Sequence, residues 1–104
     1  MPEMWFSARW PDGTERDYYS PSLVVHDHLT VGTDYPVGDF VVRATTAMTE
    51  ASERVRAKFG FACTSAAETT TRIRKDADLR TRGDVPVRVT SMGPDGPGNR
   101  KVGS

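Results

Sequence analysis

Apolar side chains occupy every second position at the start of the chain: Met4, Phe6, Ala8 and Trp10. A period of two puts such residues on one side of an extended segment, so the pattern predicts a strand with one buried face. The sequence PDG at 11–13 follows directly and has the residue types of a tight turn. We therefore predict a β-hairpin in which TERDYYS, at 14–20, returns as the second strand.

The longest pattern begins near Pro36, where apolar residues recur at spacings of three and four: Val37, Val41, Ala44, Met48, Ala51, Val55 and Phe59. This spacing aligns them along one side of an α-helix and predicts a long amphipathic helix. Gly60 is expected to end the helix, because glycine readily takes the left-handed conformation found there. Phe61 is then positioned to fold back onto Val55.

A second helix is predicted from the segment SAAE at 65–68, which has the form of a capping box, through about Arg80. Its apolar face is thin and consists of three residues: Ala66, Ile73 and Ala77. Consecutive threonines at 69–71 are β-branched and lower the helix propensity. A strand over 68–74 therefore stays open as the alternative.

A third strand is predicted near the end of the chain, where valines alternate with other residues: Val85, Val87 and Val89. Pro86 lacks a backbone N–H and implies an edge position or the start of that strand. Residues 20–29 form either a short helix, with Ser20 and Pro21 in its first positions, or an extended segment. The order ββ(α)ααβ indicates an α+β fold, a small antiparallel sheet with both helices packed on one face.

The chain of 104 residues has the length of one domain, to which we assign residues 1–92. Residues 93–104 are rich in glycine and proline, so we expect a disordered tail. A single cysteine, Cys63, cannot form an internal disulfide, and the N-terminus lacks the features of a signal peptide. Because no segment approaches the roughly 18 to 20 apolar residues of a membrane span, we expect a soluble, cytoplasmic protein.

Basic and acidic residues number 14 each, so the whole molecule has no net charge to attract nucleic acid or anionic lipid. Residues 1–42 contain two arginines and seven acidic residues, whereas residues 43–82 contain nine basic and five acidic residues. The two regions could complement each other within one subunit or face a charged partner. Two acid–base pairs on the long helix have the i,i+4 spacing of ion pairs: Asp39 with Arg43 and Glu50 with Arg54.

Three side chains carry the candidate chemistry. His26 and His28 are the only histidines, and on an extended segment both could reach one metal ion. A zinc site needs about three or four protein ligands, so carboxylates would have to complete it, and the metal hypothesis is the weaker one. Cys63 is either a nucleophile near a helix N-terminus or, as we favour, a buried inert thiol. Motifs for nucleotide binding or a nucleophile elbow are absent, and we assign no catalytic residue and no cofactor.

Basic residues cluster in two runs, ERVRAK and RIRK: Arg54, Arg56, Lys58, Arg72, Arg74 and Lys75. Side by side, the two runs could contact phosphates. Acidic residues are interleaved with them and no recognition motif accompanies them, which weighs against nucleic acid as a partner. The candidate partner-binding residues are centred on the first run: Arg54, Arg56, Lys58, Phe61 and Cys63.

Several segments, in order, resemble a small family described as nitrogen-starvation response proteins: MPEMWFSARWPDG, YSPSL, GTDYP and ASERVRAKFGFACTSA. The resemblance spans residues 1 to about 92. It implies genes encoded beside a nitrilase, in clusters linked to cyanide and nitrile assimilation. It implies no activity, and because none of the matching segments is a catalytic motif, no residue takes a chemical role from it.

The leading hypothesis is a non-catalytic accessory protein that docks onto an enzyme of this pathway. The outward aromatics Trp5 and Tyr19, with the long apolar stripe, also suggest a homodimer or a protein partner. Two other classes stay open. One is a regulator that binds nucleic acid or a nitrogen metabolite through the basic helices, and the other is a small enzyme acting on a nitrile-derived intermediate through Cys63 or His26.

Overall fold

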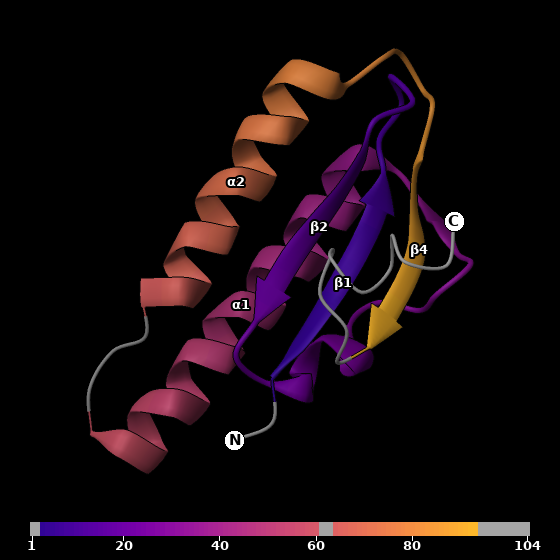
Figure 1. Cartoon of the computed structure of the whole chain (residues 1–104). Helices are drawn as coiled ribbons and strands as arrows, with labels where there is room; N and C mark the ends of the chain where they lie inside the picture. Colours follow the sequence, from indigo (N-terminus) through magenta and orange to yellow (C-terminus); the bar gives the residue numbers. More distant parts are fainter. Residues whose placement is uncertain (1–2, 61–63, 94–104) are drawn as a thin grey trace.

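A computed structural model describes residues 3–60 and 64–93 of the chain (Figure 1). Its elements, in chain order, are β1 Met4–Arg9, β2 Glu15–Ser20, the 3₁₀ helix η1 Leu23–Asp27, β3 Asp34–Tyr35, α1 Val37–Phe59, α2 Thr64–Arg80 and β4 Val87–Gly93. The strands form one antiparallel sheet in the order β2-β1-β4-β3. Both helices lie on the same face of the sheet (Figure 1), and the predicted α+β class is confirmed.

The N-terminal hairpin is present as predicted. β1 and β2 pair antiparallel along their whole length. At the turn, the N–H of Gly13 donates to the carbonyl of Trp10 at 2.8 Å, and Gly13 has a φ of +91°, in the region where glycine is unstrained. The alternation buries the four predicted apolar residues, each at most 1% exposed: Met4, Phe6, Ala8 and Trp10.

One strand of the sheet was not predicted. β3 lies between the segment 20–29 and the long helix, where no element is predicted from the sequence, and pairs with the first residues of β4. Two residues are too few for any alternation to be visible in the sequence. The pairing places β4 inside the sheet, so Pro86 precedes the strand rather than marking an edge, and Val85 is exposed outside it.

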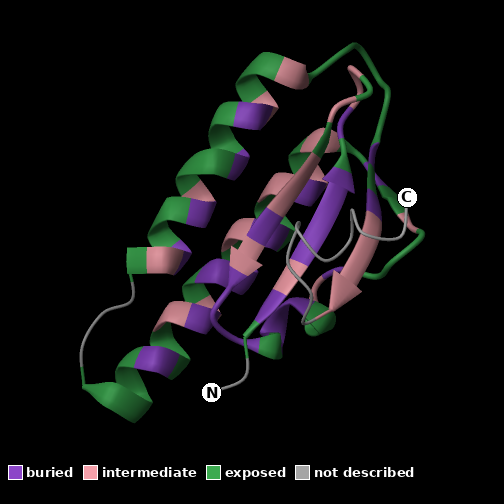
Figure 2. Cartoon of the chain, in the orientation of Figure 1, coloured by how far each residue is buried: buried purple, intermediate pink, exposed green. Residues whose placement is uncertain are grey.

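The core lies between the sheet and the helices (Figure 2). The predicted stripe of α1 is largely confirmed, because the buried residues of this helix are Phe40, Ala44, Ala47, Met48, Ala51 and Val55. Phe40, which the predicted stripe omits, meets Trp10 edge to face at a ring-centroid distance of 5.4 Å. Phe59, which the stripe includes, is 50% exposed, so that part of the prediction is wrong.

Residues 64–80 form α2, so the alternative of a strand over 68–74 is wrong. The helix begins at Thr64, one residue before the predicted capping box. Ser65 is therefore a helical residue rather than the cap, and the predicted start of the helix needs this correction.

The threonines of α2 are accommodated through hydrogen bonds to carbonyl oxygens. Thr71 donates its hydroxyl to the carbonyl of Ala67 at 3.1 Å within the helix, a local bond that threonine often makes. Thr69, which is buried, donates to the carbonyl of Tyr19 at 2.7 Å. This second bond joins α2 to the edge strand β2 and gives a polar residue a place on the buried face of the helix.

Of the two conformations predicted for residues 20–29, the structure has the short helix, which is η1. Its cap is Ser22, whose Oγ accepts a hydrogen bond from the N–H of Val24 at 3.3 Å. Ser20, predicted for this role, instead donates its hydroxyl to the carbonyl of Ser22 at 2.6 Å. The cap thus lies two residues later than predicted.

In the segments that the structure describes, no helix is long and apolar enough to cross a membrane. Gly93, which the prediction assigns to the tail, is the last residue of β4, so the predicted start of the tail is wrong by one residue. The rest of the predicted tail, 94–104, and the predicted contact of Phe61 with Val55 lie outside the described residues. The assignment of residues 1–92 to a single domain stays a prediction.

Candidate functional site

The C-terminal end of α1 extends beyond the sheet (Figure 1). A helix of 23 residues is about 35 Å long at 1.5 Å per residue, whereas a strand of six residues spans about 20 Å. The last turns of α1 therefore have no strand to cover. Every residue from 56 to 60 is exposed, which explains why Phe59 is not buried.

Three basic side chains project from this end of α1 and are called the α1 basic surface below: Arg54, Arg56 and Lys58. Arg54 and Lys58 are four residues apart and share one side of the helix, whereas Arg56 projects from a different side. Within residues 3–60 and 64–93, none of the three forms an ion pair, whereas four other arginines each contact a carboxylate: Arg16, Arg43, Arg80 and Arg88. The other candidate partner-binding residues, Phe61 and Cys63, lie outside the described residues. The three positive charges of the α1 basic surface are thus held in no ion pair among the described residues.

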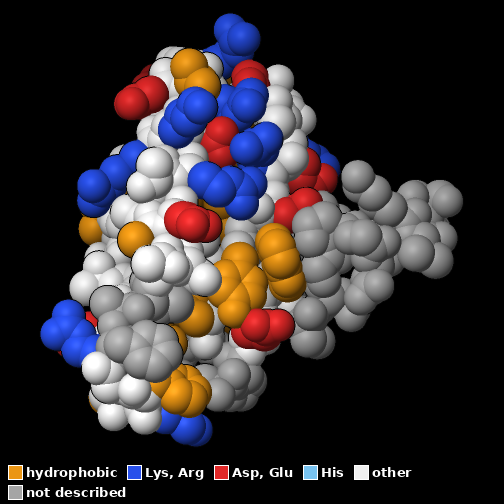
Figure 3. Space-filling model, turned by 60° about the vertical axis from the view of Figure 1, so that its left-hand side comes forward, with side chains coloured by type: hydrophobic (Ala, Val, Ile, Leu, Met, Phe, Trp, Pro, Cys, Tyr) orange, Lys and Arg blue, Asp and Glu red, His pale blue; other side chains and the backbone are white. Residues whose placement is uncertain are grey.

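The second basic run lies on the exposed face of α2. Arg72, Arg74 and Lys75 are all exposed, and the guanidinium of Arg72 lies 5.3 Å from the ring centroid of Tyr18. Basic and acidic side chains are mixed on this side of the molecule (Figure 3). The α2 run therefore does not form a uniformly positive surface of the kind that phosphate backbones attract.

The two histidines, His26 in η1 and His28 directly after it, have different surroundings. His26 is exposed, whereas Nε2 of the half-buried His28 lies 2.9 Å from Oε2 of Glu50 on α1. Glu50 thus contacts η1 rather than the arginine four residues later, while the other predicted pair, Asp39 with Arg43, is present at 2.9 Å. No group of three or more potential metal ligands occurs among the described residues. The structure does not bring the two histidines together at one site.

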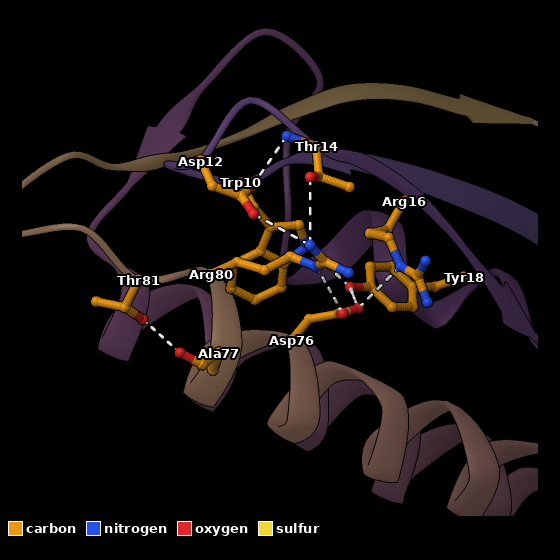
Figure 4. Close-up of polar contacts among 9 residues, drawn as sticks. All are labelled: Trp10, Asp12, Thr14, Arg16, Tyr18, Asp76, Ala77, Arg80 and Thr81. Atoms are coloured by element: carbon orange, nitrogen blue, oxygen red, sulfur yellow. Dashed lines mark hydrogen bonds and ion pairs between the residues drawn. The ribbon is translucent and has the colours of Figure 1, made fainter.

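A buried carboxylate, Asp76, lies between α2 and the hairpin (Figure 4). Its oxygens accept hydrogen bonds from the Tyr18 hydroxyl at 2.5 Å, from Arg16 Nε at 3.2 Å and from Arg80 Nε at 3.0 Å. Asp76 follows Ile73 by three residues, and this spacing turns both side chains to the buried side of α2. Two guanidinium groups and a hydroxyl compensate the charge that the fold removes from water.

The same network holds the hairpin turn against the C-terminal end of α2. Nη1 of Arg80 donates to Asp12 Oδ2 at 3.0 Å and to Thr14 Oγ1 at 3.3 Å. Nε1 of Trp10 donates to the Tyr18 hydroxyl oxygen at 2.9 Å, so that oxygen both accepts and donates. No buried side-chain nitrogen or oxygen of the described residues lacks a hydrogen-bond partner. The buried polar atoms of this network are thus engaged with one another, and their hydrogen bonds stabilise the fold.

These contacts shift the pKa values of three members of the network. Burial, followed by the hydrogen bond to Asp76, raises the pKa of Tyr18 far above its ordinary value. The backbone N–H of Thr14, together with Arg80, lowers the pKa of the Asp12 carboxyl, and the hydrogen bond to Asp76 raises the pKa of Arg80. Each shift favours the protonation state that the hydrogen bonds require: a neutral tyrosine, an ionised aspartate and a charged arginine.

Asp76 is not among the residues predicted from the sequence to be functional, although the sequence contains a signal for its burial. An acidic residue follows Ile73 by three positions on a thin apolar face, and Arg80 follows four positions later. The partners on β2 are distant in the sequence, with Tyr18 separated from Asp76 by 58 residues. Only the folded chain shows that the carboxylate is buried.

Stability should fall as the pH rises above about 10, the ordinary pKa of tyrosine. The unfolded chain releases the Tyr18 proton near that value, whereas the folded chain retains it because its pKa is raised. The unfolded state therefore binds fewer protons, and stability is lost with rising pH. Urea unfolding followed by tryptophan fluorescence should give a lower midpoint at about pH 11 than at about pH 8. In Tyr18→Phe this alkaline decrease should be smaller, and an equal decrease in both proteins would contradict the assignment.

The face of the sheet opposite the helices carries the two outward aromatics. Trp5 and Tyr19 are cross-strand partners and meet edge to face at a ring-centroid distance of 5.6 Å. The Tyr19 hydroxyl donates to Glu3 at 2.6 Å. Both rings are partly exposed, and the homodimer suggested from them stays a prediction.

The family described as "Nitrogen starvation-induced protein NitG" matches residues 5–92 of the chain. The matched residues include the hairpin, both helices and most of β4. Comparisons with curated proteins and with solved structures give no match. The resemblance to nitrogen-starvation proteins is confirmed at the level of the family, and the match does not extend to the predicted association with a nitrilase gene cluster.

Proposed function

Since the chain belongs to the family of nitrogen starvation-induced protein NitG, we propose that it is a non-catalytic accessory protein of the nitrogen-starvation response. In this proposal it docks onto another protein through the α1 basic surface. The observation that carries the proposal is the exposed end of α1, where three basic side chains have no carboxylate partner among the described residues. A partner with an acidic surface would complement these charges.

The candidate catalytic residues support this proposal over an enzyme. His26 is exposed on η1, and His28 is engaged with Glu50. The buried polar network around Asp76 is satisfied by its own members. Acid–base or nucleophilic catalysis needs a group held near a second group that activates it. His28 and Glu50 form a pair of this kind outside the network, but it does not include His26, the histidine on which the enzyme hypothesis depends.

The partner that we propose is an enzyme of nitrile assimilation encoded beside this protein, as the family resemblance implies. Exposed charges at the rim of an interface mainly speed association and set its salt dependence. Complex formation should therefore weaken as ionic strength rises, because salt screens exposed charges over about 10 Å at 0.1 M.

Growth under nitrogen limitation tests the proposal in cells that lack their own copy of the protein. Reversing the α1 basic surface, as Arg54→Glu, Arg56→Glu and Lys58→Glu together, is expected to abolish rescue. These residues are exposed, so the variant should fold and accumulate normally, as judged by immunoblotting and circular dichroism. A matched control reverses three exposed charges away from this surface and should rescue growth: Arg74→Glu, Lys75→Glu and Arg82→Glu.

Two single substitutions separate the accessory protein from an enzyme. Cys63→Ser and His26→Ala should both rescue growth fully, because the proposal gives neither side chain a chemical role. Loss of rescue by either variant at normal protein level would favour the small-enzyme hypothesis instead. If the control variant, with Arg74, Lys75 and Arg82 reversed to glutamate, failed to rescue growth, that result would favour a function of the second basic run, such as nucleic-acid binding.

A further inference from the structure

A hollow of about 220 Å³ lies between α1 and α2 and opens to solvent. Both helices contribute small side chains to its lining, among them Ser52 on α1 and Thr70 on α2. Met48 and Ala66 are buried and supply apolar surface at its base. Its volume is below the roughly 300 to 1,000 Å³ of sites for drug-sized molecules, so any ligand must be small.

Four polar side chains line this hollow and are not engaged elsewhere. Glu53 and Arg56 are exposed, and Ser52 and Thr70 are half-buried. In the part of the chain that the structure describes, no side-chain hydrogen bond or ion pair involves any of the four. The hollow therefore combines an acid, a base and two hydroxyl groups that remain available to a ligand.

We propose that this hollow binds a small amino acid in its zwitterionic form. The planar guanidinium of Arg56 suits the carboxylate of such a ligand, with which it can form two parallel hydrogen bonds. Glu53 is three residues earlier, on the same side of α1, and suits the ammonium group. The hydroxyls of Ser52 and Thr70 supply further hydrogen bonds, and the ligand side chain rests on the apolar base.

The paired charges set the class of ligand. A ligand with only negative charge is attracted by Arg56 but repelled by Glu53. A ligand with only positive charge is attracted by Glu53 but repelled by Arg56. A zwitterion satisfies both groups, which lie on adjacent turns of one helix. Because the hollow is open and offers few contacts, the dissociation constant should be on the order of 1 mM.

NMR titration of the full-length, ¹⁵N-labelled chain with L-alanine and with L-glutamine tests this site. Saturable amide shifts are expected at the residues of the hollow: Ser52, Glu53, Arg56 and Thr70. Propionate and ethylamine, which each lack one of the two charges, should bind at least about tenfold more weakly than L-alanine. Arg56→Gln should weaken binding of L-alanine about tenfold, whereas Arg54→Gln, with the same change of charge on an exposed residue outside the hollow, should leave it unchanged.

Ala67→Leu provides a second variant that leaves the charges in place. Ala67 lines the hollow and is exposed, so leucine should fill the space without disturbing the core and should abolish the amide shifts. Because the α1 basic surface is intact, this variant should still dock, which separates the site from the proposed accessory function. The proposal is overturned if neither amino acid gives saturable shifts. It is also overturned if propionate binds as tightly as L-alanine, or if Arg54→Gln weakens binding as much as Arg56→Gln.

Discussion

Replacing Asp76 by alanine is expected to lower the free energy of unfolding by about 3 kcal/mol. The carboxylate is 3% exposed and accepts hydrogen bonds from Tyr18, Arg16 and Arg80. Its removal leaves two guanidinium groups without their shared counter-ion and a buried hydroxyl without its acceptor. Urea unfolding at neutral pH, followed by tryptophan fluorescence, measures the change, with Trp10 as a reporter that lies within the network.

Asp39→Ala is the matched control, because Asp39 also pairs with an arginine but is exposed. Its i,i+4 pair with Arg43 should contribute no more than about 0.5 kcal/mol. Equal losses of stability in the two variants would mean that burial of Asp76 contributes nothing beyond a surface ion pair, and the structural role assigned to the network would be wrong.

Replacing Ile73 by alanine is expected to cost about 3 to 4 kcal/mol, within the range measured for buried isoleucine. Ile73 is fully buried, and the other buried residues of α2 are small or polar: Ala66, Thr69 and Asp76. Most of the apolar contact between α2 and the core therefore depends on this one side chain. Thermal and urea unfolding should both show the loss, since a domain of this size is stable by only about 5 to 15 kcal/mol.

Leu79→Ala serves as the control on the same helix, because Leu79 is 65% exposed. Its effect should stay within about 0.5 kcal/mol of zero, as for most surface substitutions. If Ile73→Ala cost less than about 1 kcal/mol, or if Leu79→Ala cost as much, the face of α2 assigned to the core would be incorrect.

The elements that the sequence predicts well are those whose periodicity continues over several repeats. The alternation of β1 and the spacing of three and four in α1 are long enough to identify both elements and most of their buried residues. β3 contains two residues and cannot show a period. Phe59 fits the period of α1, yet it is exposed because the sheet ends before the helix does, and the extent of the sheet is a property of the whole fold.

The second helix and the polar network depend on contacts between distant parts of the chain. The threonines of α2 leave helix and strand both plausible from local propensity. The bond from Thr69 to Tyr19 joins residues 50 positions apart, and the bond from Tyr18 to Asp76 joins residues 58 positions apart. A local sequence pattern does not contain such pairings. The sequence therefore leaves helix and strand both open for residues 68–74, and it does not identify Asp76 as a buried residue.

The exposure of the candidate site residues and the geometry of the histidines depend on the whole fold to different degrees. The basic residues of ERVRAK are all exposed at the end of α1, because the helix is longer than the strands beneath it, and their role in binding a partner stays a prediction. The geometry of the two histidines could not be decided from sequence, since helical and extended forms of residues 23–29 direct them differently. His26 lies in η1 and is exposed, whereas His28 directly follows η1 and contacts Glu50. The hollow between the helices also depends on tertiary packing.

Affinity purification of the tagged chain from nitrogen-starved cells, with mass spectrometry of the proteins bound, tests the proposed docking most directly. We predict that an enzyme of nitrile assimilation encoded beside this protein co-purifies with it. The complex should also form from the two purified proteins, weaken at high salt and be lost when Arg54, Arg56 and Lys58 are reversed to glutamate. Failure of every neighbouring enzyme to bind, or undiminished binding by the reversed variant, would contradict the proposal that this protein acts by docking through the end of α1.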